Sequence, residues 1–291
     1  MAKLFSFLIC FLIPYPGFTN QLLTLDQTLD FKWRGLPIAT MSFKASLPIQ
    51  DVQTTVSGLA TPPFKPTTLI EITGETRGAL RLVEDYQAVV SYVQLDANGK
   101  NAMTLLGQDN GEPEHREIIC APGSMPEVRL FEDSTAENAL KPQAGWAADT
   151  TNPLHVFKLM LESTVLGAKC ATQTWGYDGK RRYLLKLESS GGAPSLDHQL
   201  ISNAVAGDET TQRHVCKITM YAEGRQSADS HGAKPSIVAS RLASLWPFGD
   251  GDRELLFDFD VSVNPGDARE SQLMINEIRV ATPLGAIVAR E

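Results

Sequence analysis

Apolar and polar residues alternate with a period of two along much of this chain. Leu29, Phe31 and Trp33 are separated by charged residues, and after the turn residues Gly35-Leu36-Pro37 the same alternation resumes and continues to Leu47. This period places successive side chains on opposite faces of a β-strand, so one face is buried and the other is solvated. Such a pattern excludes a mainly helical fold.

Further strand-like runs, broken by Pro, Gly and Asn-Gly pairs, continue to the C-terminus. The last of them, Met274 to Thr282 and Ala286 to Ala289, flank Pro283-Leu284-Gly285 and are typical of a hairpin. The sequence therefore predicts a mainly β fold, a curled antiparallel sheet or a barrel-like, β-spiral single domain with one central helix.

The helix is predicted between Thr151 and Gly167. Asn152 or Thr151 can cap its start and Pro153 suits its first turn, and apolar residues follow at helical spacing: Leu154, Phe157, Leu161 and Val165. Residues 132–150 before it are rich in Ala, Glu and Asp and predict a crossing loop, with a sub-boundary there inside one domain of residues 20–291.

The N-terminus is typical of an export signal. Lys3 precedes an apolar run from Leu4 to Ile13, which is about half the length that a membrane-spanning helix needs. We expect residues 1–19 to be a signal peptide that is cleaved near Thr19, which places the mature protein in the periplasm without a transmembrane segment. The net charge of −8 disfavours nucleic-acid binding.

Cleavage would leave three cysteines in an oxidising compartment, enough for one disulfide and one free thiol. An Asp178-Gly179 turn predicts a hairpin in which Tyr177 opposes Lys180 and Trp175 opposes Arg182. In that register Cys170 faces the core.

Cys216 shares its strand face with Ile218 and Met220, so it also faces inward. We predict a Cys170–Cys216 disulfide, and a buried thiol at a strand end for Cys120. Pairings that involve Cys120 stay open, because connectivity does not follow from sequence alone.

The same hairpin carries the dense basic cluster of the chain. Its register predicts an outward patch in which cations stack on aromatic rings, with the residues Trp175, Tyr177, Lys180, Arg181 and Arg182. Such a patch could bind an anionic lipid headgroup, a cell-wall polymer or an acidic protein. The alternative is a solubilising hairpin tip.

The usual catalytic signatures are absent from the sequence, and we predict no catalytic residues, metal ligands or cofactor. His214 lies next but one to Cys216, but an oxidised cysteine offers no thiolate to a metal. Asp258 and Asp260 could resemble an acid/base pair, and a solvated strand face is the simpler interpretation.

Several short motifs together resemble a family. They are Trp33-Arg34-Gly35-Leu36-Pro37-Ile38, Asn152-Pro153-Leu154, Cys170 ahead of Tyr177-Asp178-Gly179-Lys180-Arg181-Arg182-Tyr183, and Arg279-Val280-Ala281-Thr282-Pro283-Leu284-Gly285. Over about residues 28–290 the chain resembles the bacterial domain of unknown function numbered 3108. The resemblance implies an exported, β-rich protein with no assigned reaction. Asn152 departs from the Asp expected before Pro-Leu, although Asn also caps helices.

These observations predict a non-enzymatic periplasmic protein that supports cell-envelope integrity by binding an envelope component: a protein, a cell-wall polymer or a lipid. A first alternative is a carrier that holds a lipid or another apolar ligand in a curved β-sheet. A second is a hydrolase of envelope material whose site is built from scattered residues.

Overall fold

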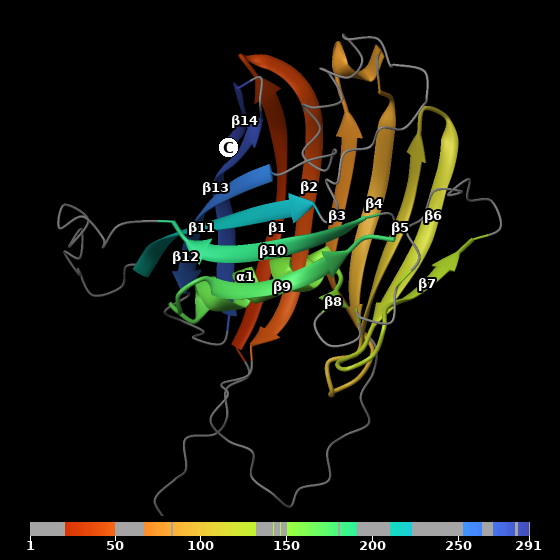
Figure 1. Ribbon diagram of the computed structural model, residues 1–291. Coiled ribbons are helices and arrows are strands. Elements are labelled where there is room, and N and C mark those ends of the chain that lie inside the picture. The colour runs from red at the N-terminus through yellow and green to blue at the C-terminus, as the bar shows by residue number, and fades with distance from the viewer. Residues whose placement is uncertain are drawn as a thin grey trace, which may run out of the picture.

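The computed structural model describes residues 21–49, 67–82, 84–131, 142, 146, 150–179, 181–190, 210–222, 253–263, 270–282 and 285–290. The predicted signal peptide and most of the predicted crossing loop lie outside these residues. The described residues form one sheet of 14 strands that curls without closing into a barrel (Figure 1). The predicted fold class, a mainly β single domain with a curled sheet, is confirmed.

The first half of the sheet is an antiparallel meander. Its strands are β1 (Gln21–Trp33), β2 (Leu36–Ile49), β3 (Thr67–Thr76), β4 (Tyr86–Gln94), β5 (Asn101–Asp109), β6 (Glu112–Cys120) and β7 (Glu127–Leu130). A short 3-10 helix, η1 (Leu80–Leu82), lies between β3 and β4.

The second half runs from β8 (Thr150–Thr151) through β9 (Ala171–Tyr177), β10 (Arg182–Ser189), β11 (Thr210–Ala222), β12 (Arg253–Val263) and β13 (Glu270–Thr282) to β14 (Gly285–Arg290). β1 joins the halves, because it pairs with β2 on one side and with β14 and β13 on the other. The β1–β13 and β8–β9 pairings are parallel, which the sequence analysis did not anticipate.

On β1 and β2 the apolar residues of the period-two alternation are buried, as predicted. On β1 the buried residues are Leu23, Leu25, Leu29 and Phe31, and on β2 they are Ile38, Ala39, Met41, Phe43, Ala45 and Leu47. A two-residue loop joins the strands, and both of its residues, Arg34 and Gly35, have positive φ (51° and 82°). This backbone matches the right-handed twist of a hairpin, so Trp33 and Leu36 come to lie opposite each other.

The helix α1 (Pro153–Val165) lies inside the curl of the sheet and contacts β4, β9, β10 and β12 (Figure 1). Asn152 caps it as predicted, because its side-chain oxygen accepts a hydrogen bond from the His155 backbone N–H. The helix buries Leu154, Val156, Phe157, Met160, Leu161 and Thr164, so most of its surface faces protein.

The predicted register of the β9–β10 hairpin is wrong by two residues. Tyr177 pairs with Arg182, and Trp175 pairs with Leu184. The loop has four residues because the Asp178 carboxylate accepts a hydrogen bond from the Arg181 backbone N–H at 2.7 Å and another from the Tyr183 hydroxyl at 2.8 Å. An error of two preserves the faces of both strands, and Cys170 still points into the core.

Candidate ligand-binding cavity

A cavity of about 100 Å³ lies between α1 and the inner face of the curled sheet, and it is partly open. Both halves of the sheet contribute to its walls. The lining residues are all apolar: Phe31, Met41, Phe43, Ile72, Pro153, Leu154, Val156, Phe157, Leu185, Ile218, Met220, Leu255, Phe257, Ile278 and Val280. A water molecule inside would find no hydrogen-bond partner on these side chains, so the cavity favours an apolar guest.

Aromatic contacts hold the helix against both halves of the sheet. The ring centroid of Phe157 on α1 lies 6.3 Å from that of Phe43 on β2 and 5.7 Å from that of Phe257 on β12. Phe257 in turn stacks on Phe259 with the rings nearly parallel, at 5.8 Å. Phe157 therefore forms part of the cavity wall at the point where the two halves approach each other.

Polar contacts fix the start of the helix beside the cavity. Asn152 is buried, and its amide nitrogen donates to the side-chain oxygen of Asn101 on β5. One residue past the cavity-lining Leu154, the Nδ1 atom of His155 shares a hydrogen bond with the Tyr92 hydroxyl at 2.9 Å. Burial lowers the pKa of His155 to about 4 and raises the pKa of Tyr92 above its ordinary value, so both groups are neutral at pH 7.

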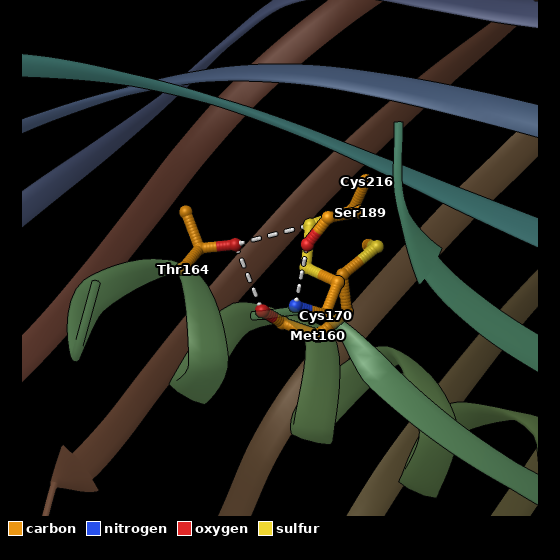
Figure 2. The surroundings of a disulfide bond; sticks show 5 residues. All are labelled: Met160, Thr164, Cys170, Ser189 and Cys216. Atoms are coloured by element: carbon orange, nitrogen blue, oxygen red, sulfur yellow. Dashed lines mark hydrogen bonds between the residues drawn. A yellow bond between two sulfur atoms is a disulfide. The ribbon is translucent and has the colours of Figure 1, made fainter. Parts of the chain in front are cut away.

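The predicted disulfide between Cys170 and Cys216 is present, with 5.9 Å between the two Cα atoms. It links the residue before β9 to β11 next to the C-terminal part of α1 (Figure 2). The Ser189 hydroxyl oxygen accepts the Cys170 backbone N–H, and the Thr164 hydroxyl on α1 contacts both the Met160 carbonyl oxygen and Cys216 Sγ. The helix end and three segments of the second half of the sheet are thus joined at one place.

Cys120 is the free cysteine among the described residues, and it is buried at the end of β6 as predicted. Burial raises the pKa of its thiol to about 12, so the thiol keeps its proton at neutral pH.

The predicted outward patch on the β9–β10 hairpin is wrong in its geometry. Tyr177 and Arg182 are buried, Trp175 and Arg181 are half-buried, and Lys180 lies outside the described residues. The structure does bring Arg182 close to Trp175, with the guanidinium carbon 4.2 Å from the ring centroid. Whether the patch binds a partner stays a prediction, but its four described residues do not form an exposed surface.

Arg182 is buried because a second ring covers it. Its guanidinium carbon also lies 4.8 Å from the Trp146 ring centroid, and its Nε and Nη2 atoms donate to the Thr150 hydroxyl oxygen. Trp146 packs edge-on against Tyr177 at 5.2 Å. The sequence analysis missed Trp146 because it lies within the loop predicted at residues 132–150.

A second buried cation, Arg116 on β6, was also missed. It forms an ion pair with Glu114 on the same face of its strand, and both residues are buried. Its Nε atom donates to the Asp178 carbonyl oxygen at 2.6 Å. The sequence pattern that could have predicted this ion pair is Glu114 and Arg116 two positions apart, because residues at i and i+2 of a strand lie on the same face.

The remaining sequence candidates do not assemble into a reactive site. Asp258 alternates with the inward-facing Phe257 and Phe259 and so lies on the outer face of β12, where the exposed Arg213 covers it and donates from Nε to its carboxylate at 2.8 Å. Burial lowers the pKa of His214. Within the described part of the chain, no three His, Cys, Asp or Glu side chains are grouped as metal ligands would be.

No described helix is both long enough and apolar enough to cross a membrane. Comparison with known proteins gives no match to a family model, to a curated protein or to a solved structure.

Proposed function

We propose that this protein is a carrier that binds an apolar ligand, of the chemical class of a lipid acyl chain, in the cavity beside α1. The observation that carries the proposal is the cavity lining, which consists entirely of apolar side chains drawn from the helix and from both halves of the sheet. Catalysis would need polar or titratable groups that face the ligand, and the lining includes none.

The size and the flexibility of the walls agree with this class of ligand. An apolar cavity of roughly 150 Å³ in a protein core stays dry and accepts a small hydrocarbon. The cavity here, about 100 Å³, is smaller, so it admits a short segment of an acyl chain and the walls must move for a longer one. Met41 and Met220 lie in the wall, and unbranched thioether side chains can change rotamer to admit a longer guest.

The proposal takes up the first alternative predicted from the sequence, a carrier of a lipid or another apolar ligand, and the main prediction, support of envelope integrity by binding an envelope component, stays a prediction. Export to the periplasm, which the N-terminal residues predict, would place the carrier between two membranes. The suggested membership of the family of unknown function numbered 3108 stays a prediction, as does the absence of enzymatic activity.

Binding is tested with 11-(dansylamino)undecanoic acid, whose fluorescence rises in an apolar site. We expect saturable binding to the purified full chain and displacement by oleic acid. Native mass spectrometry of protein purified from the periplasm supplies a second readout, because a co-purifying lipid adds its own mass.

A matched pair of variants locates the ligand. Ile72 on β3 lines the cavity, and Val90 on β4 is its cross-strand partner outside the lining; both are half-buried. Ile72→Phe should weaken dansyl-probe binding about tenfold by filling the cavity, whereas Val90→Phe should leave it unchanged. Equal binding by both variants and the original chain would place the ligand elsewhere and overturn the proposal.

A further inference from the structure

We propose that the tip of the β1–β2 hairpin, together with η1, docks this protein on a phospholipid bilayer that carries anionic headgroups. The docking surface, called the tip below, consists of Trp33, Arg34, Leu36 and Leu82. Both elements lie at the same end of the sheet (Figure 1).

The tip contains the two most exposed large apolar residues that the structure describes. Leu82 is 89% exposed and Leu36 is 59% exposed. The other exposed large apolar residues that the structure describes are between 38% and 49% exposed. Trp33 is the cross-strand partner of Leu36, and aromatic rings of this kind favour the boundary between lipid headgroups and acyl chains. Two leucines beside a tryptophan suit insertion into that boundary.

Backbone contacts hold the two parts of the tip together. The Arg77 backbone N–H donates to the Ile38 carbonyl oxygen at 2.8 Å. Gly78 lies so close to Pro37 that an added Cβ would meet its carbonyl oxygen at 2.6 Å. The segment that leads into η1 therefore packs directly on the start of β2, and Leu82 is part of the same end of the molecule.

The charge of the tip selects an anionic bilayer. The guanidinium carbon of Arg34 lies 4.9 Å from the Trp33 ring centroid. Among the described residues no carboxylate forms an ion pair with Arg34. Nearby, Arg77 pairs with Glu75 and Arg81 pairs with Asp85, so their charges are compensated. The chain as a whole has a net charge of −8, and only a local cationic and apolar site can overcome its repulsion from anionic lipid.

The tip also lies close to the cavity along β1. Trp33 follows Phe31 by two positions on β1, so both side chains lie on the inner face of the sheet, and Phe31 lines the cavity. Trp33 packs at the edge of the same apolar core. A ligand that leaves a bilayer at the tip would meet Trp33 and then Phe31; this last step rests on the proposed function, whereas docking itself does not.

Docking is tested by co-sedimentation of the full chain with vesicles of phosphatidylcholine and phosphatidylglycerol at about 3:1, and with vesicles of phosphatidylcholine alone. We expect binding to the mixed vesicles and a blue shift of tryptophan emission. The double variant Leu36→Ser/Leu82→Ser should lower the partition coefficient about tenfold or more, since each leucine contributes by leaving water. Arg34→Gln should reduce the preference for the mixed vesicles.

The matched control is Leu106→Ser/Leu166→Ser, which removes two leucines that are 47% and 49% exposed and belong to β5 and to the residue after α1. It should bind vesicles as the original chain does. An equal loss in both double variants, or no vesicle binding by the original chain, would overturn the docking proposal, and capture of a protein partner by the tip without vesicle binding would do the same.

Dansyl-probe binding without vesicles separates this proposal from the proposed function. If the tip variant keeps probe binding and loses vesicle binding, both proposals stand. If the original chain binds vesicles and no probe, the carrier function is wrong and docking stands.

Discussion

Arg116 on β6 donates a hydrogen bond to the carbonyl oxygen of Asp178, 62 positions later in the chain and in the opposite half of the sheet. Gly179 follows immediately, and a Cβ there would lie 2.6 Å from Arg116 Cδ. The two halves of the curled sheet meet here through a buried cation and a glycine.

Gly179→Ala should therefore destabilise the fold by about 2 kcal/mol or more. Gly179 has a φ of +92°, which strains any side chain, and the new methyl group would also displace Arg116. Urea unfolding measures the loss. Gly123→Ala is the control, because Gly123 has a φ of +72° and no atom within 4 Å of its added Cβ, so it shows the backbone cost alone. Equal losses in the two variants would mean that Arg116 moves aside freely.

Removal of the disulfide should lower stability by roughly 4 kcal/mol in the chain-entropy model, because the Cys170–Cys216 bond closes a loop with a sequence separation of 46. The measurement compares the unfolding midpoint of Cys170→Ser/Cys216→Ser with that of the original chain in oxidising buffer. Addition of reductant is the control, since it should lower the midpoint of the original chain and leave that of the variant in place. A variant as stable as the oxidised chain would contradict the bond.

The stability of the fold should rise with pH between about 4 and about 6.5 because of His155. Its pKa is about 4 in the folded protein and 6.5 in its ordinary state, so the unfolded chain binds the additional proton in this interval. Below the interval both states are protonated, and the contribution of the neutral histidine, up to about 3 kcal/mol, is lost.

The pH dependence is isolated by comparing the original chain with His155→Gln in urea unfolding at pH 4 to 8. The variant has no proton to take up at this position, so the difference in unfolding free energy between the two proteins should change across the interval and level off above pH 7. A constant difference would show that His155 keeps an ordinary pKa.

The alternation of side chains was sufficient to predict the strands, because burial on one face of a sheet is a local property of the sequence. The helix start was equally local, since Asn152 and Pro153 carry the capping signal in two adjacent residues. The cysteine pairing could be predicted because alternate residues of a strand lie on the same face, so the strand pattern alone shows that both cysteines face inward. An error of two residues in the hairpin register does not change which face a residue occupies.

The environment of the hairpin could not be predicted in the same way. The Asp178 side chain competes with the backbone for the Arg181 N–H and enlarges the loop, and Trp146 and Arg116 reach the hairpin from distant parts of the chain. The sequence analysis predicted that a curved sheet could hold an apolar ligand, but it did not predict which residues line the cavity. Its lining combines β1–β3 with β10–β13, and that combination depends on the curl of the whole sheet.

The position of β1 has a consequence for the time course of folding. The first described strand pairs on one edge with β14, the last, so the sheet is a single unit only after both ends of the chain are present. During synthesis, which starts at the N-terminus, the β1–β7 meander can form early. The other edge of β1 then stays unpaired until β13 and β14 have been synthesised. Contacts of such long sequence separation slow folding, and until they form, the unpaired edge of β1 can pair with the strand of another chain.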